Sequence, residues 1–66
     1  MKVEVECEED GRWIAEVPAI PGALVYGASR TEAVSRVEAL VLRVLADRLE
    51  NGEPTHELEE VFSVST

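Results

Sequence analysis

Cysteine and histidine each occur once in this chain, and the scarcity of both excludes whole classes of chemistry. A single cysteine excludes an intrachain disulfide, and Cys7 falls in an expected strand, where a small buried hydrophobic side chain is a better interpretation than a reactive thiol. His56 has no second metal ligand or catalytic partner at a motif spacing, so we expect its side chain to be solvated. There is no Ser/His/Asp set and no glycine-rich phosphate loop. The sequence therefore predicts no enzyme and no cofactor.

Basic residues are also few. Six Lys and Arg stand against fourteen Asp and Glu, which gives a formal net charge of −8 at pH 7. Such a field repels phosphate, so direct nucleic-acid binding is disfavoured. A basic protein partner is favoured instead, because complementary charge speeds encounter and selects partners. The alternative is that the charge confers solubility alone.

Long apolar runs and a basic N-terminus are missing as well. No run approaches the roughly 20 apolar residues that a membrane span needs, and the opening MKVEVECEED is too acidic for a signal peptide. We therefore expect a cytoplasmic protein with no membrane association. The 66 residues form a single domain, residues 1–66. A domain of this size buries only about 60% of the surface that its unfolded chain exposes, so self-association would stabilise it.

The longest periodic segment runs from Ser29 to Asn51 and predicts a helix around which the rest of the chain is arranged. Ser29 is the expected N-cap, because its hydroxyl can accept a hydrogen bond from the backbone N–H of Glu32, whose carboxylate can reach back to Ser29. No Gly or Pro interrupts this segment. Gly52, followed by Pro54, predicts its end.

One stripe of this helix is apolar at the spacing that a sheet-packing helix requires. Its members are Ala33, Val34, Val37, Leu40, Val41, Val44 and Leu45. Leu42 and Leu49 lie beyond the stripe and widen the apolar arc past what one small sheet covers. Leaving either of them exposed forgoes roughly 1.5–3 kcal/mol of burial, so we expect a subunit interface there. The alternative is a terminal segment that folds over them.

Two alternating segments, Lys2–Glu8 and Arg12–Val17, predict half-buried strands. A two-residue turn between them would mix their apolar and polar faces, whereas a three-residue loop with Gly11 in the left-handed region aligns the apolar faces. The pairs predicted by the longer loop are Cys7 with Trp13, Val5 with Ala15 and Val3 with Val17. This register places Trp13 under the helix, where its apolar body suits the core.

A corner then ends the second strand, because proline donates no ladder hydrogen bond and glycine permits a tight turn. The residues that shape the corner are Pro18, Pro21 and Gly22. Ala23–Tyr26 predicts a third strand, Gly27 leads to the helix cap, and Leu58–Val64 predicts a returning fourth strand. The order β-β-β-α-β defines an α+β fold. It is a two-layer sandwich of an antiparallel three-stranded meander and a returning strand, with one long helix on one face.

The strand face turned away from the helix collects negative charge. The residues that we expect on it to bind a partner are Glu4, Glu6, Glu8, Ile14 and Glu16. The register sets Glu8 beside Arg12, which is favourable, and Glu4 beside Glu16, which is mildly unfavourable. A face that is merely solvated is the alternative. A metal-dependent nuclease is a further alternative, but alternation leaves these carboxylates on an open face rather than in a cleft.

The segment from Asp10-Gly11 to Ala33, DGRWIAEVPAIPGALVYGASRTEA, resembles the HicB family of antitoxin partner domains. That family's pattern runs from a DG turn and an aromatic residue through vPxlPGxxxxGxTxxEA into a helix. Gly11 and Trp13 correspond to its beginning. The later matches are Val17, Pro18, Ile20, Pro21, Gly22, Gly27, Glu32 and Ala33, with Ser29 where threonine is usual.

The resemblance implies a truncated RNase H-like fold, dimeric or tetrameric, that binds a small basic HicA-type toxin ribonuclease and occludes its active site. Full-length antitoxins of this kind carry a helix-turn-helix or ribbon-helix-helix segment after the fourth strand. This chain ends at Thr66, so we expect no DNA binding from it alone. A solitary homo-oligomeric structural or ligand-binding domain is the alternative. Ile20 and Tyr26, beside the rigid proline corner, are further candidates for an oligomer interface.

Overall fold

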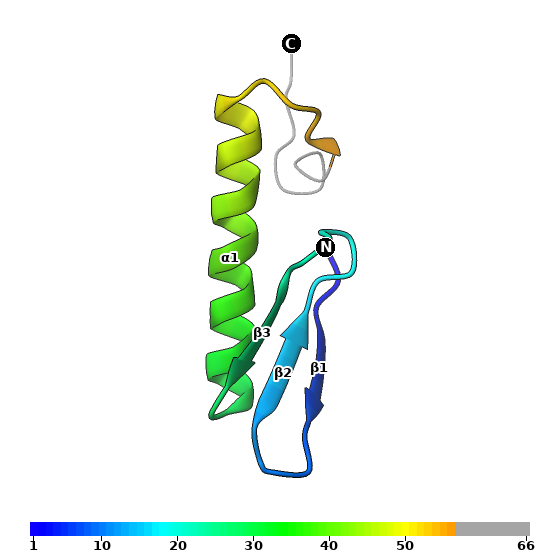
Figure 1. The fold of residues 1–66 in the computed structure, drawn as a ribbon, viewed down its shortest axis with the longest axis vertical. Coiled ribbons are helices and arrows are strands. Elements are labelled where there is room, and N and C mark those ends of the chain that lie inside the picture. Colours follow the sequence, from blue (N-terminus) through cyan, green and yellow to red (C-terminus); the bar gives the residue numbers. More distant parts are fainter. Residues whose placement is uncertain (57–66) are drawn as a thin grey trace.

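The computed structural model describes residues 1–56 of the chain. Within them, three strands form an antiparallel sheet in the order β1-β2-β3, and one long helix covers one face of it (Figure 1). The elements are β1 (Glu4–Cys7), β2 (Trp13–Glu16), β3 (Leu24–Gly27) and α1 (Arg30–Glu50). The predicted α+β class is confirmed. The predicted fourth strand, Leu58–Val64, lies outside the described residues.

The β1–β2 hairpin has the predicted register. The observed pairs are Glu4 with Glu16, Val5 with Ala15, Glu6 with Ile14 and Cys7 with Trp13. The loop that joins the strands places Gly11 at a φ of 89°, and the N–H of Glu8 donates to the carbonyl of Arg12 at 2.7 Å. The three-residue loop that the apolar pattern required is therefore the one that forms.

The proline corner, residues 18–22, consists of two successive turns. Pro18 takes the second position of the first turn, which is closed by a 3.0 Å hydrogen bond from the N–H of Ile20. Pro21 and Gly22 are the central residues of the second, which the N–H of Ala23 closes at 3.0 Å. Gly22 has a φ of 84°, the conformation that the third position of a type II turn demands. The corner thus turns the chain back from β2 into β3.

Helix α1 begins as predicted at Ser29, whose hydroxyl accepts a 3.1 Å hydrogen bond from the N–H of Glu32. The reciprocal half of the expected capping box does not form. The carboxylate of Glu32 instead pairs with Arg36 at 2.9 Å, because the guanidinium one turn along the helix offers a charged donor. Ser29 alone therefore caps this end through its side chain.

The other end of α1 closes with two backbone hydrogen bonds. The N–H of Gly52 donates to the carbonyl of Leu49 at 3.2 Å, and that of Glu53 to the carbonyl of Arg48 at 2.9 Å. This is the Schellman pattern, with Gly52 at a φ of 71°. The end predicted at Asn51-Gly52 is confirmed.

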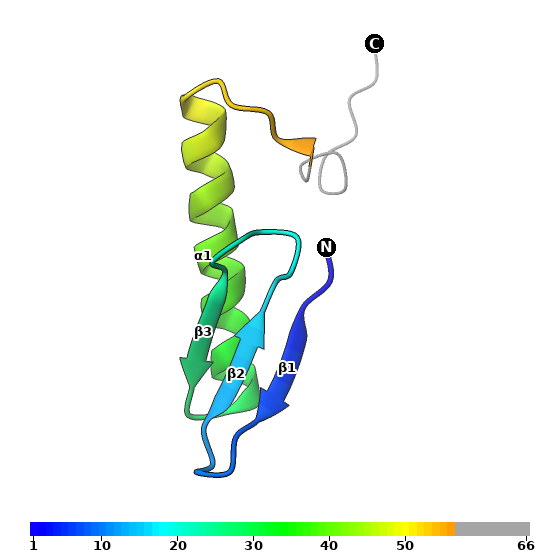
Figure 2. The same cartoon turned by 45° about the vertical axis from the view of Figure 1, so that its right-hand side comes forward.

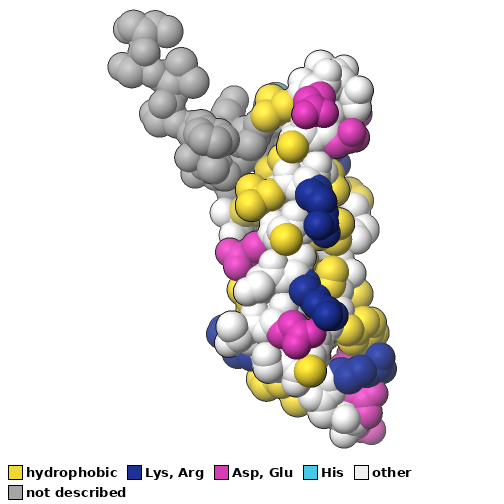
Figure 3. Space-filling model, turned by 90° about the vertical axis from the view of Figure 1, so that its left-hand side faces the viewer, with side chains coloured by type: hydrophobic (Ala, Val, Ile, Leu, Met, Phe, Trp, Pro, Cys, Tyr) yellow, Lys and Arg dark blue, Asp and Glu magenta, His cyan; other side chains and the backbone are white. Residues whose placement is uncertain are grey.

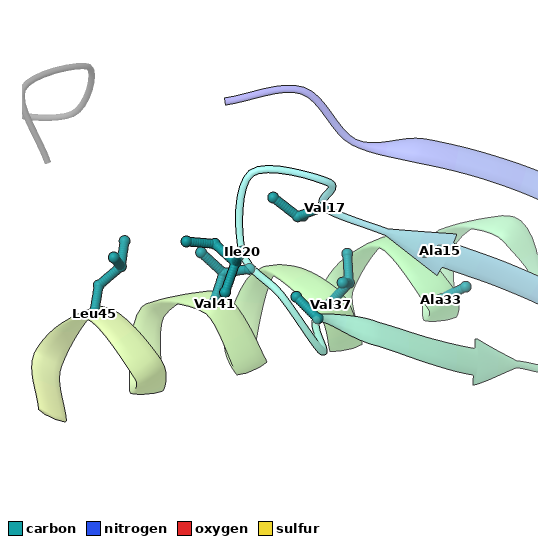
Figure 4. Packing of buried hydrophobic residues seen from close by; sticks show 8 residues of the cluster. Ala15, Val17, Ile20, Ala33, Val37, Val41 and Leu45 are labelled. Carbon is teal, nitrogen blue, oxygen red and sulfur yellow. The ribbon is translucent and has the colours of Figure 1, made fainter. Parts of the chain in front are cut away.

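The core lies between one stripe of α1 and the covered face of the sheet (Figure 4). Its buried members are Ala15, Val17, Ile20, Ala23, Ala33, Val37, Val41 and Leu45. The helical members recur every four residues, as the apolar stripe predicted. Figures 1 and 2 show that the C-terminal turns of α1 extend past the end of the sheet. The sheet therefore covers only part of the length of the helix.

Gly27 sets the distance between the sheet and the start of α1. A Cβ added there would lie 2.6 Å from the backbone nitrogen of Ala33 and 2.9 Å from its Cα. Since these are backbone atoms, no side-chain rotation could relieve the contact. Across the ladder, Trp13 lies opposite Gly27 and packs, partly buried, against the core. The helix can therefore approach the sheet closely only at a residue without a side chain.

Two expectations about burial are wrong. Cys7 is exposed rather than buried, because β1 is an edge strand and α1 packs mainly against β2 and β3. Ile20, predicted at an oligomer surface, is 2% exposed and lies in the core of the single chain. The proline corner turns its side chain inward toward Val41 (Figure 4).

Candidate protein-interaction surface

The sheet face that α1 leaves uncovered is the candidate site. Because side chains alternate along a strand, the two registers combine into rows that cross all three strands. One row consists of Glu4, Glu16 and Leu24, and the next of Glu6, Ile14 and Tyr26. We call these six residues the outer sheet face.

The centre of the outer sheet face is apolar. Leu24 is 43% exposed and Tyr26 is 41% exposed, and Ile14 lies half-buried beside them on β2. A shallow depression runs between Ile14, Leu24 and the glutamates of β1. Exposed apolar side chains scattered singly are ordinary, but three that adjoin on one open sheet face form a patch. This patch gives the face a hydrophobic centre that a partner could bury.

Carboxylates border this apolar centre, and most of them lack a cation. Lys2 contacts Glu4 at 3.6 Å, with both side chains largely in solvent. Within residues 1–56, Glu6, Glu8 and Glu16 have no ion-pair partner. Surface carboxylates left unpaired in one chain are available to Lys or Arg side chains of another.

Arg12 does not balance this charge, although the register sets it beside Glu8. Its Nε donates to Asp10 at 2.7 Å, and its guanidinium lies 4.5 Å from the ring centroid of Tyr26. The backbone N–H of Arg12 also donates to Asp10, and together with the guanidinium it lowers the pKa of that carboxyl. The predicted side-chain pair of Glu8 with Arg12 is thus replaced by one with Asp10, which is closer in the hairpin loop.

The structure brings the predicted partner-binding residues together. Glu4, Glu6, Ile14 and Glu16 share the outer sheet face, and Glu8 follows at the end of β1. Leu24 was not anticipated, because the expected third strand is too short for alternation alone to assign its faces. Its role becomes visible once the β2–β3 register sets it opposite Glu16.

The four residues predicted at an oligomer interface do not form one surface. Tyr26 lies on the outer sheet face, whereas Leu42 and Leu49 lie on α1 and are 60% and 54% exposed. Ile20 is in the core. The expectation that Leu42 and Leu49 lie beyond the core stripe is confirmed. A small apolar cleft of about 180 Å³ adjoins Leu42 and is also lined by Met1 and Val3.

Residues 1–56 lack the arrangements that a metal site or a membrane-spanning helix requires. Among residues 1–56, no group of three or more His, Cys, Asp or Glu side chains is placed to hold a metal ion. His56 is exposed, as expected. None of the described helices is long and apolar enough to cross a membrane.

Fold and surface together define a small α+β domain with an acidic, apolar-centred sheet face. Neither a family model, nor a curated protein, nor a solved structure matches this chain.

Proposed function

We propose that this chain is a non-catalytic HicB-like antitoxin domain that binds a small basic HicA-type toxin ribonuclease and covers its active site. The outer sheet face is the observation that supports this most directly. A basic partner with an apolar centre and a Lys/Arg rim would bury Ile14, Leu24 and Tyr26 and pair with Glu6 and Glu16. Such a domain inhibits by occupying a surface, so it needs no catalytic group of its own.

The residues that carry the family resemblance build the scaffold of the domain, whereas the proposed contact residues lie on the exposed face of its sheet. Pro18, Pro21 and Gly22 build the corner, Gly27 sets the helix against the sheet, and Ser29 caps the helix. These roles belong to the scaffold. The glutamates that would meet a toxin lie on the face that the scaffold presents. The proposal places the domain in the cytoplasm, where a toxin ribonuclease meets its RNA.

The test begins with the neighbouring reading frames. If a short basic one is present, the two chains are co-expressed, and co-purification and RNA cleavage are measured. We expect a complex in which cleavage is lost and which high salt weakens, because rim charges are screened. If no HicA-type partner binds even at low salt, the proposal is wrong.

A pair of matched variants locates the contact. Glu6→Gln with Glu16→Gln removes two charges from the outer sheet face, whereas Glu38→Gln with Glu53→Gln removes two exposed charges elsewhere. Both variants have the same net charge, so long-range steering changes equally. We expect the first to weaken binding by about tenfold, equivalent to about 1.4 kcal/mol, and the second to change it little. Equal losses in both would contradict contact through this face.

A solitary homo-oligomeric structural or ligand-binding domain is the second candidate. The exposure of Leu42 and Leu49 and the apolar cleft beside them favour it. This candidate predicts a defined homo-oligomer with no companion chain. A HicA-like reading frame beside its own would count against it.

A further inference from the structure

Strand β1 is an edge of the sheet, and its outward backbone groups have no partner among the described residues (Figure 2). The N–H of Glu8 donates to the carbonyl of Arg12 at 2.7 Å, so every second residue before Glu8 also turns its backbone groups toward β2. The N–H and carbonyl groups of Val5 and Cys7 therefore point away from the sheet. Within residues 1–56, no hydrogen bond engages them. They are the groups to which a further strand would bind.

The opposite edge of the sheet, along β3, is already occupied. The carbonyl of Tyr26 accepts a 3.0 Å hydrogen bond from Arg36, and the N–H of Leu24 donates to Gly22 at 3.0 Å. Occupied edge groups are less available to a further strand. In contrast, β1 contains no proline, glycine or bulge that would interrupt pairing. Of the two edges, β1 is the one that can accept a strand.

The side chains along this edge alternate between an acidic row and an apolar row. The acidic row, on the side of the outer sheet face, consists of Glu4, Glu6 and Glu8. The apolar row, on the side of α1, consists of Val3, Val5 and Cys7. Because neighbouring strands share their two faces, alternate side chains of an added strand would lie beside each row. The strand that fits carries basic residues on one face and apolar residues on the other.

An apolar cleft adjoins the apolar row. Its volume is about 180 Å³, and Val3 lines it together with Leu42 and Leu45 of α1. Val3 and Val5 are only half-buried against the core, because α1 packs mainly against β2 and β3. An apolar side chain placed next to Val3 would lie beside this cleft and bury more of the row. The edge thus offers apolar contacts in addition to backbone hydrogen bonds.

The chain's own cations leave the acidic row largely unbalanced. Four of the six Lys and Arg residues belong to α1, and Figure 3 shows basic side chains along that side of the molecule. Of the other two, Lys2 contacts Glu4 at 3.6 Å, and Arg12 is engaged with Asp10 at 2.7 Å. The acidic row therefore depends on another chain for most of its counter-charge.

We propose that the free edge of β1 binds an extended segment of a basic partner protein, in which Lys or Arg residues alternate with apolar residues. The inference rests on the proposed function, because it describes how the toxin contacts this domain. The segment pairs its backbone with Val5 and Cys7, its cations lie beside the acidic row, and its apolar side chains extend the apolar row. The rest of the partner then covers the outer sheet face.

Two other strands that could reach this edge lack the required charge. A second copy of β1, aligned so that the apolar rows adjoin, sets glutamate beside glutamate, which is destabilising. Residues 57–66, which include the predicted fourth strand, contain three glutamates and no Lys or Arg. They offer the acidic row no cation. A basic segment of another protein supplies what both of these strands lack.

Amide hydrogen exchange of the full chain, followed by NMR, tests this occupant. The probe is a short peptide of alternating lysine and valine, added at about ten times its Kd. The amides of Val5 and Cys7 are expected to exchange rapidly in the free chain and about tenfold more slowly with the peptide, because only the unbound tenth then exchanges. The amide of Glu6, which faces β2, is expected to be protected in both samples.

Two control peptides separate charge from pattern. One alternates glutamate with valine, and the other has the same lysines and valines grouped in two blocks. Neither is expected to protect Val5 or Cys7. Slow exchange of these two amides in the free chain would mean that residues 57–66 or a second copy already holds the edge, and would overturn the proposal. Failure of the alternating lysine peptide to bind, or binding without protection, would also overturn it.

A proline variant tests the backbone contact. Cys7→Pro removes an outward N–H of the edge, a position at which a strand tolerates proline, whereas Cys7→Ala keeps it. We expect Cys7→Pro to weaken binding of the lysine peptide at least about tenfold and Cys7→Ala to change it little. A toxin that both variants bind equally would overturn the edge contact and leave the antitoxin proposal standing. If no toxin binds, the antitoxin proposal fails, and the peptide still decides what the edge accepts.

Discussion

At Gly27, an added methyl group would meet backbone and not a movable side chain. The nitrogen and Cα of Ala33 lie 2.6 and 2.9 Å from the position of that Cβ. We expect Gly27→Ala to lower the free energy of unfolding by about 1–3 kcal/mol, the range for overpacking a tight contact. Urea denaturation followed by circular dichroism would measure the loss. Adding Ala33→Gly to the variant should not recover stability, since the clashing atoms remain, and recovery would contradict this explanation.

Single residues also mark the places where sequence patterns fail. The alternation of β1 assigned Cys7 to the correct side of the strand, but alternation does not reveal how far a helix extends across a sheet. Cys7 lies at the uncovered edge and is exposed. For Ile20, the corner sequence predicted a turn, yet the direction of its side chain depends on two successive turns acting together. Burial at such positions is set by tertiary packing, which no local pattern contains.

At the scale of one element, α1 depends at its N-terminus on a single side-chain cap. Ser29 accepts from the N–H of Glu32 at 3.1 Å, and the carboxylate of Glu32 is engaged with Arg36. Ser29→Ala is therefore expected to lower the free energy of unfolding by about 1 kcal/mol, whereas Ser29→Thr, which keeps the hydroxyl, should stay close to wild type. Equal stability of all three proteins in urea denaturation would show that the cap contributes nothing.

The elements themselves follow closely from the sequence. The start of α1 at Ser29, its end at Gly52 and the hairpin register each result from a local rule: a cap, a left-handed glycine and the alignment of two apolar faces. Strand ends differ by one or two residues from those predicted. The apolar centre of the outer sheet face could not be foreseen in full, because Leu24 joins Ile14 only through pairing between strands.

At the scale of the whole molecule, exposed apolar side chains with charged neighbours lie on two sides of the domain. The sheet presents carboxylates around an apolar centre, and α1 carries exposed Leu42 and Leu49 on another side of the domain. A 66-residue chain has a small core, so covering either surface adds appreciably to its stability.

Self-association of this chain would make its stability depend on its concentration. If two chains fold as a dimer, stability depends on protein concentration, because dilution favours separated and unfolded chains. A tenfold change in concentration is worth about 1.4 kcal/mol per dimer, or about 0.7 kcal/mol per chain, which corresponds to about 3–5 °C in Tm for a domain of this size. Calorimetry at several concentrations should show this rise for the wild type and for Ala19→Glu, which adds a charge at an exposed alanine of the proline corner. For Ala46→Glu, which places a charge between the exposed Leu42 and Leu49 of α1, Tm should be lower and should depend less on concentration, since the dimer is weaker. A wild-type Tm that does not change with concentration would mean that self-association contributes nothing to folding.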